Sequence, residues 1–455
     1  MKELEQYRAA MSRLPEGCRE AEAQAERQKK LSVELVDGMP GAMSLSEQTE
    51  LFVRASGEKT GMVYTQKLDE DPDKVIRQAL VNSEAGQSPK PEPMCAPGLW
   101  EQLGRSQTRE EVPVPEVSVP ELKEFGRALS QVLQKECAQG DRVRISLGQT
   151  ILTMGLVNSL GMDTAASGSR YTAEVMTDSG YAGYLSAPGL EELSADYFLE
   201  EMERWKRTRL PVIPSTSGIF RAVLSSGVVN NILITAWQMF TGSRALGGTT
   251  PFAGKEGQQI FSPCVTIRDY KGGRDSKNSV TCGFSWELDC EGVPSQDLTL
   301  VENGVLKGWM HNLSSAWQAG AASTGNAGRK TLLSGNIHTD TLIMPKNFTI
   351  ESGNASLGEL LADCGDGIYI FENYDQFHAL NVASGDFAFP CKGIRICDGK
   401  LTGVMEGLTM NGNVAGLFSH IEKLGRDRAV NPLVMYDSYT VSGPSMLVRE
   451  LRISG

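Results

Sequence analysis

The chain has 455 residues, of which 40% are hydrophobic and 22% are charged, so it is long enough for several folded domains and is not disordered throughout. Its 44 basic and 56 acidic residues leave a net charge of −12, a balance that argues against general nucleic-acid binding. No run of about eighteen apolar residues predicts a membrane-spanning helix, and the charged N-terminus lacks the apolar core of a signal peptide. We therefore expect a cytoplasmic protein that is not associated with a membrane and keeps its thiols reduced.

The first half of the chain alternates between helical and strand-like patterns. Residues 2–30 are rich in Glu, Gln, Ala, Lys and Arg, which favours a helix. The pattern that follows predicts, in chain order, strands at 31–36, 50–55 and 60–65, a helix from Pro72 to about 85, a helix over 120–138, strands at 142–147, 149–157 and 169–176, and a helix at 195–206.

The second half has a different texture. One convincing helix is predicted at 228–240, and many short strand-like segments separated by Gly, Asn and Asp follow it. Asn303-Gly304 and Asp398-Gly399 are dipeptides typical of tight β-hairpins. We therefore expect a closed or sandwich-like β domain there, with a mainly antiparallel sheet after residue 245.

Together these patterns predict an α+β fold, in which an N-terminal α/β-type region of helices and antiparallel strands is followed by a β-rich C-terminal domain. The predicted regions are an N-terminal α+β subdomain (1–85), a Pro-rich linker (86–120), a second α+β subdomain (121–210) and the β-rich C-terminal domain (211–455).

Unaided, the sequence shows no self-sufficient catalytic constellation. Its four histidines are at least 27 residues apart, and its nine cysteines form no CxxC pair, so no local zinc motif can be built. Glu287, Asp289 and Glu291 occupy alternate positions and would share one face of a strand. Such carboxylates do acid–base chemistry only when burial or neighbours separate their pKa values. A solvated strand face or turn is the more ordinary interpretation.

Several segments resemble one known family, the TldD/PmbA family. Val53–Gly61 resembles the arginine–glycine strand turn of its first domain, Ser323–Arg329 its Ser-Thr-Gly loop, and Asn381–Phe387 its S/T-G-D-F segment. The remaining motifs follow in the family's order: Asp398–Lys400, Glu406–Asn413, Leu424–Asp427 and Gly443–Ser445. The resemblance extends over essentially the whole chain and is densest over 218–455.

The resemblance implies a metallopeptidase assembly of two related subunits that enclose a chamber where unfolded peptides are cut. The TldD-type subunit carries an HExxxH helix and a distant Cys, which together hold zinc, and the Glu can act as a general base on zinc-bound water. The PmbA-type subunit, also called TldE, lacks these ligands. The family is linked to peptide maturation, and older descriptions of PmbA name it a modulator of DNA gyrase.

In this chain the corresponding helical segment, 227–236, has no His and no Glu, and no Cys follows Cys397. The resemblance therefore implies the PmbA type: a non-catalytic chain with no catalytic residue, no metal ligand and no cofactor of its own, whose TldD-type partner carries zinc. A homodimeric peptide-binding or regulatory protein, and a peptidase with an unrecognised site near Cys391 and Cys397, remain alternatives. We expect a homodimer when the chain is alone.

The candidate contacts for a peptide substrate lie in two glycine-containing turns, because glycine lets a backbone approach closely. A purely structural turn is the competing interpretation for both. The candidate residues are Ser323, Thr324, Gly325, Arg329, Ser384, Gly385, Asp386 and Phe387.

Overall fold

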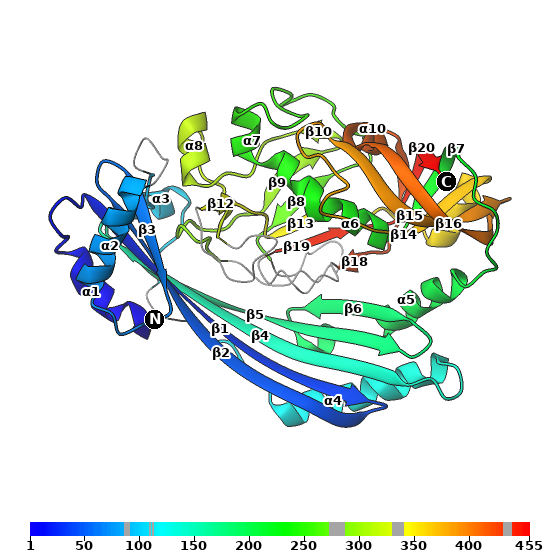
Figure 1. Cartoon of the computed structure of the whole chain (residues 1–455), viewed down its shortest axis with the longest axis horizontal. Coiled ribbons are helices and arrows are strands. Elements are labelled where there is room, and N and C mark those ends of the chain that lie inside the picture. Colours follow the sequence, from blue (N-terminus) through cyan, green and yellow to red (C-terminus); the bar gives the residue numbers. More distant parts are fainter. Residues whose placement is uncertain (86–91, 109–110, 112, 273–286, 330–340, 431–438) are drawn as a thin grey trace.

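The computed structural model describes residues 1–85, 92–108, 111, 113–272, 287–329, 341–430 and 439–455. Figure 1 shows a long curved sheet with helices, built from the first 210 residues, beside a β-rich part that contains the rest of the chain. This arrangement confirms the predicted α+β class with a β-rich C-terminal region. None of the helices in the described part of the chain is both long and apolar enough to cross a bilayer.

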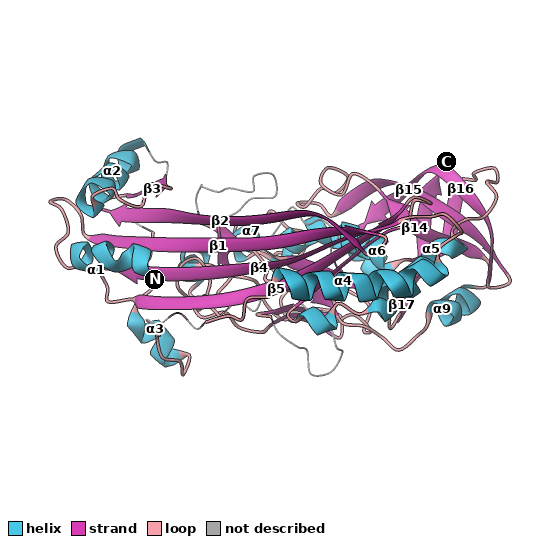
Figure 2. Cartoon of the chain, turned by 90° about the horizontal axis from the view of Figure 1, so that it is seen from below, coloured by secondary structure: helices cyan, strands magenta, loops and turns pink. Residues whose placement is uncertain are grey.

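The N-terminal sheet has six strands, and every neighbouring pair is antiparallel. Its four central strands are long and run side by side in Figure 2. In spatial order the strands are β3 (Thr60–Thr65), β2 (Met39–Ser56), β1 (Glu20–Val36), β4 (Val143–Asn158), β5 (Asp163–Thr177) and β6 (Ala182–Ala187). The helices of this half are α1 (Glu5–Met11), α2 (Pro72–Ala85), α3 (Pro97–Gln102), α4 (Val119–Leu133) and α5 (Ala195–Arg207).

The predicted helix over 2–30 is wrong beyond Met11, because residues 20–36 form the strand β1. β1 lies between β2 and β4 along nearly its whole length, so both of its edges are hydrogen-bonded. Its small residues Ala21, Ala23 and Ala25 are buried on one face of the sheet. This long-range pairing overrides the local helix preference of the segment. It also means that residues 1–85 and 121–210 share one sheet.

The C-terminal half is built on two further six-stranded sheets. One has the order β10 (Val305–Leu306), β9 (Leu298–Glu302), β8 (Ile267–Tyr270), β13 (Asn347–Ile350), β19 (Thr440–Gly443) and β18 (Ala429–Val430). The other has the order β16 (Lys400–Asn413), β15 (Asp386–Cys397), β14 (Gly367–Asn373), β7 (Gly218–Leu224), β20 (Met446–Ser454) and β17 (Ile421–Leu424), and β16 also pairs with β20, which closes the sheet on itself. β11 (Ala327–Gly328) and β12 (Leu342–Ile343) form a small separate pair.

Helix α6 (Ser226–Ala236) lies at the centre of the largest hydrophobic cluster of this half. Nine of its eleven residues are buried, and it contacts both β14 of the closed sheet and β19 of the other sheet. The shorter helices are α7 (Gly242–Leu246), α8 (Leu313–Ala319), α9 (Leu357–Cys364) and α10 (Val414–Ser419).

Candidate functional site

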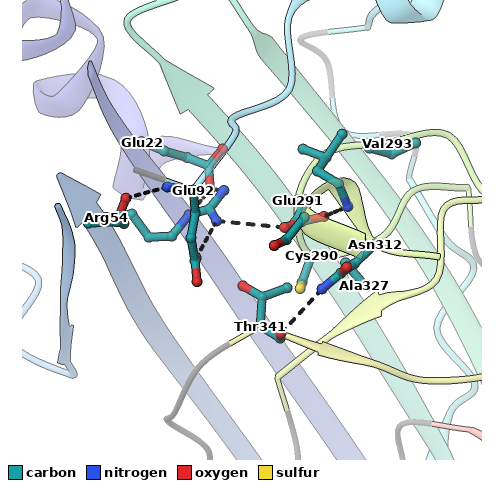
Figure 3. Close-up of polar contacts among 12 residues, drawn as sticks. Glu22, Arg54, Glu92, Cys290, Glu291, Val293, Asn312, Ala327 and Thr341 are labelled. Carbon is teal, nitrogen blue, oxygen red and sulfur yellow. Dashed lines mark hydrogen bonds and ion pairs between the residues drawn. The ribbon is translucent and has the colours of Figure 1, made fainter. Parts of the chain in front are cut away.

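Arg54 of β2, from the Val53–Gly61 motif, is fully buried where the N-terminal sheet meets the C-terminal half. Its Nε donates to Glu22 Oε1 on β1 at 3.1 Å, and its Nη1 lies 3.5 Å from Glu92 Oε2 and 3.6 Å from Glu291 Oε1 (Figure 3). Burial alone would lower the pKa of this guanidinium, but the surrounding carboxylates outweigh burial and raise it. One cation therefore joins three segments that are distant in sequence.

The alternating acids 287–291 do not form a solvated face, contrary to the ordinary interpretation. Glu287 is about half exposed, whereas Asp289 and Glu291 are buried. A tight turn closes here because the Asp289 N–H donates to the carbonyl of Val293, and the Asp289 carboxylate accepts the N–H groups of Glu291, Val293 and Ala327, each at 2.9 Å. Contact with the N-terminal half, which no local pattern reveals, is what buries Glu291 beside Arg54.

Burial raises the pKa of both buried carboxyl groups, that of Glu291 to about 8. The three N–H donors to Asp289 oppose this rise, because hydrogen bonds to a carboxylate favour its ionised form. Glu291 Oε2 accepts one N–H, from Leu313 at the start of α8 (2.7 Å). We therefore assign the proton of the pair to Glu291 and the charge to Asp289 at neutral pH.

The segment Ser323–Gly325 forms a turn whose side chains are hydrogen-bonded within the fold. Ser323 is buried and donates its hydroxyl to the carbonyl of His311 (3.3 Å), and Thr324 Oγ1 accepts the His311 N–H (2.7 Å). Gly325 has φ +71°, and a Cβ added there would lie 2.5 Å from the carbonyl oxygen of Pro294. The turn therefore requires glycine for backbone and steric reasons.

Arg329, from the same motif, reaches across to the N-terminal sheet. Its guanidinium lies 3.4 Å from the centre of the Phe52 ring and donates to Gln24 of β1 and to the carbonyl of Cys290. It lies 3.6 Å from Glu22, which also binds Arg54, and burial lowers the pKa of Arg329. Arg54 from one half and Arg329 from the other thus share one carboxylate, so this buried charge cluster holds the two halves together.

The segment that contains Glu92 completes the cluster. Glu92 donates its N–H to Thr60 Oγ1, and Trp100 on α3 donates its indole N–H to the carbonyl of Gly292 (2.8 Å). Sequence reasoning missed both Glu22 and Glu92. Glu22 lay within a predicted helix, and Glu92 lay within a predicted linker, so no local signal placed either beside Arg54.

The cluster contains two thiols, Cys95 and Cys290, both buried. Burial raises the pKa of Cys290 to about 12 and that of Cys95 further still. A thiol is nucleophilic as the thiolate, so at neutral pH these two side chains behave as small apolar groups. The arrangement is suited to positioning the two halves and not to covalent catalysis.

The other predicted segment, Ser384–Phe387, lies at the start of β15 and belongs to a separate part of the molecule. Asp386 is exposed. Hydrogen bonds lower the pKa of its carboxyl group, and the one from Asn413 has a larger effect than the one from Ser384. Gly385 has φ +82° and packs near Asn413 and Pro251, while Phe387 is buried. Only the Asp386 end of this segment therefore presents a charged group to solvent.

Two more motif segments meet at the N-terminus of α6. Ser445 donates its hydroxyl to Asp427 Oδ2 (2.7 Å) and accepts the N–H of Ser226 (3.1 Å), and Arg204 of α5 lies 3.9 Å from Asp427. A cleft of about 740 Å³ adjoins this network between α5 and the closed sheet. The motifs Leu424–Asp427 and Gly443–Ser445 thus position α6 and one wall of the cleft.

Helix α6 is where the family resemblance places the zinc-binding segment. α6 contains neither His nor Glu, and the polar side chains within it include Asn230, Asn231 and Thr235. Their side chains are hydrogen-bonded to the Gly443 N–H, to Asn373 Oδ1 and to the Gln376 carbonyl, at 2.8, 2.9 and 2.7 Å respectively. Amides and a hydroxyl are not the imidazole and thiolate donors of a catalytic zinc site, so α6 does not fit zinc. Within the described residues, no group of three His, Cys, Asp or Glu side chains is arranged to hold a metal ion.

Comparison with known proteins gives consistent results. Residues 217–455 match the model of the PmbA/TldA metallopeptidase C-terminal domain. The chain is 27% identical over 226 residues to a metalloprotease TldD homologue of Haemophilus influenzae (49% of this chain, 44% of the relative) and 24% identical over 237 residues to a metalloprotease PmbA homologue of Buchnera aphidicola subsp. Baizongia pistaciae (51% and 46%). These matches span about half the length of the curated relatives. Among solved structures, the fold resembles that of TldE from Thermococcus kodakarensis, with a TM-score of 0.77 and 21% identity over all of both chains.

Proposed function

Because the chain belongs to the PmbA/TldD metallopeptidase family, we propose that it is the zinc-free, non-catalytic subunit of a two-subunit TldD/TldE-type metallopeptidase that processes unfolded peptides. The observation that carries the proposal is α6, which contains neither His nor Glu and whose polar side chains Asn230, Asn231 and Thr235 are hydrogen-bonded within the fold. A TldD-type partner supplies zinc and the general base, and the pair acts in the cytoplasm on peptides rather than on nucleic acid.

In this pair, the chain shapes the chamber and holds peptide in an extended form. The exposed carboxylate of Asp386 is the favoured contact among the predicted residues, because it can accept an N–H or pair with a basic side chain of a peptide. Arg329 and Ser323 act indirectly in this proposal, since their side chains are engaged in the buried charge cluster and in the turn beneath it.

The test is reconstitution with a TldD-type subunit loaded with zinc. Cleavage of an unstructured peptide is measured for each subunit alone, for the pair, and for the pair after chelation. We expect cleavage by the pair only, and its loss on chelation. Cleavage by the present chain alone would refute the proposal, as would full activity of the TldD-type subunit without it.

Substitution of Asp386 by Ala separates binding from folding. Its side chain is exposed but accepts a hydrogen bond from Asn413, so we expect a small fall in melting temperature together with a raised KM of the reconstituted pair. Glu302→Ala serves as the control, because Glu302 is also a partly exposed carboxylate and is paired with Lys307 on the surface. Equal kinetics for the two variants would show that the Ser384–Phe387 turn is structural.

A further inference from the structure

The cleft of about 740 Å³ between α5 and the closed sheet has a lining that is balanced in charge. It lies where the last helix of the N-terminal half meets β14 and the start of α6 (Figure 1). The ionisable side chains that line it are Arg204, Arg209, Lys392, Glu201, Glu372 and Glu406. Because acids and bases are equal in number, a ligand with several charges of one sign gains little here.

Most of these charges are already paired with one another. Arg204 donates a hydrogen bond to Glu201. Lys392 Nζ lies 3.3 Å from Glu406 and 3.8 Å from Glu372. In the part of the chain that the structure describes, no carboxylate pairs with the remaining base, Arg209. Arg209 is exposed, and its guanidinium lies 5.0 Å from the centre of the Trp205 ring. It is therefore available to a ligand.

The start of α6 brings an unused backbone donor to this cleft. The first N–H groups of a helix have no acceptor within the helix. Ser226 donates its N–H to Ser445 Oγ (3.1 Å), and Val228 donates its N–H to Ser225 Oγ (3.2 Å). Among the described residues, nothing accepts the N–H of Gly227, which lies between them and lines the cleft. A Cβ added to Gly227 would meet only Ser225 Oγ, at 3.9 Å, so the space beside it is open.

A buried tyrosine supplies a second unused donor. Tyr369 of β14 is 3% exposed and lines the same cleft. Burial, and then the Asp427 carboxylate, raise the pKa of its hydroxyl, which therefore keeps its proton at neutral pH. That carboxylate is bound by the N–H and the hydroxyl of Ser445, and no other described residue accepts the Tyr369 proton. Since buried polar groups are nearly always hydrogen-bonded, this hydroxyl indicates an acceptor from outside the fold.

The walls beside these donors are aromatic and apolar. Trp205, Phe371 and Val212 line the cleft, and Val212 is 65% exposed. Such a surface accommodates an apolar side chain. A ligand that fits the whole cleft therefore combines a small group of acceptor oxygens with an apolar body.

We propose that this cleft binds the C-terminal end of a peptide, whose carboxylate is held by the Gly227 N–H and the Tyr369 hydroxyl. The last side chain of the peptide packs on Trp205, beside Arg209. The positive end of the α6 dipole favours a carboxylate at this place. A phosphate group, with about two negative charges, is disfavoured by the three acids of the lining. The choice of a peptide rests on the proposed function, whereas the unused donors do not depend on it.

Titration calorimetry of the chain alone tests the ligand. The probe is an N-acetylated pentapeptide that ends in leucine, as the free acid and as the C-terminal amide. The free acid should bind at least about 10-fold more tightly, because hydrogen bonds to a charged acceptor are about twice as strong as those to a neutral one. Acetate, a carboxylate without a peptide, should bind far more weakly than the free acid. Equal affinities of acid and amide, binding of acetate as tight as that of the peptide, or no binding of the peptide at millimolar concentration would overturn the proposal.

A pair of glycine substitutions tests the place. Gly227→Asp puts a carboxylate in the first turn of α6, where it stabilises the helix but repels the ligand, so the affinity for the free acid should fall at least about 10-fold. Gly358→Asp is the matched control, because Gly358 is likewise the second residue of a helix, α9, and a Cβ there meets only Ser356 Oγ, at 3.9 Å. Gly358 is not part of this cleft, so the control should keep the wild-type affinity. Equal affinities of the two variants would refute the assigned place.

Tyr369→Phe separates binding from folding. The hydroxyl has no partner in the fold, so the melting temperature should stay the same or rise slightly, while the affinity for the free acid falls about 3- to 10-fold. A lower melting temperature with unchanged affinity would assign the hydroxyl to the fold and contradict the proposal. These assays need no TldD-type subunit. Peptide binding without cleavage by the reconstituted pair would therefore refute the proposed function alone, and cleavage without binding at this cleft would refute this site alone.

Discussion

Removal of the Arg54 guanidinium should destabilise the buried charge cluster that lies where the two halves of the chain meet. Arg54→Met keeps much of the aliphatic volume but leaves Glu22 buried without its main cation. Breaking a buried ion pair by removal of one partner costs about 3–5 kcal/mol. Glu291 contributes little to this cost at neutral pH, since burial raises its pKa to about 8, and Glu92 is partly solvated.

The expected change in melting temperature follows from chain length. Unfolding entropy near 60 °C is about 2.1 cal/mol/K per residue, or about 1 kcal/mol/K for 455 residues that unfold together. Arg54→Met should therefore lower the melting temperature by about 3–5 °C in scanning calorimetry. If the halves unfold separately, the transition should split, with the N-terminal half melting first.

Arg142→Met is the matched control. Arg142 is exposed and pairs with Asp178 on the surface, so its loss should cost at most about 1 kcal/mol. The effect of Arg54→Met should also grow as pH rises through about 8, because Arg54 lowers the pKa of Glu291, and without Arg54 this group stays protonated in the folded chain to a higher pH. Equal melting temperatures of R54M and R142M would refute the conclusion that the buried charge cluster stabilises the fold through Arg54.

The pH dependence of stability, one glycine turn and the metal content can be tested in the same way. Burial raises the pKa of Glu291 in the folded chain from 4.5 to about 8. Its contribution to stability is therefore complete below about pH 4.5 and is lost as pH rises through 8. Glu291→Gln should flatten the fall in melting temperature over that range, and an unchanged profile would contradict the assignment. Gly325→Ala should lower the free energy of unfolding in urea by about 2–3 kcal/mol, because Gly325 has a positive φ and lies against Pro294. Gly320 has a similar φ but open space around it, so Gly320→Ala should lower the free energy of unfolding by about 1 kcal/mol. Equal losses would show that the contact with Pro294 is unimportant. The purified chain should retain no stoichiometric zinc after dialysis, and elemental analysis that finds about one zinc per chain would refute the proposed metal-free role.

The structure confirms predictions of local conformation that depend only on residues adjacent in the sequence. Pro72 begins α2 as expected, because proline lacks only an N–H that the first turn does not use. The hairpin turns predicted at Asn303-Gly304 and Asp398-Gly399 are present, with positive φ at both residues of each pair. In these cases the steric preferences of one or two residues decide the conformation, whatever the rest of the chain does.

The family could also be predicted without a structure. The order of the motifs identifies it, and the match over 217–455 confirms it. The motifs do not by themselves show which groups their side chains contact. Arg329 was predicted to contact peptide, but the structure places its guanidinium against Phe52 and Glu22 of the N-terminal sheet. Whether it also affects peptide binding stays a prediction.

Which polar residues are buried together depends on the tertiary structure. Residues 20–30 have the composition of a helix, yet they form a strand because both of its edges are paired with β2 and β4. Glu22, Arg54 and Glu291 lie in distant parts of the sequence, and their contact depends on that pairing and on the docking of the C-terminal half. Burial and Coulomb energy depend on distances in space, so a pattern of neighbouring residues carries no information about them.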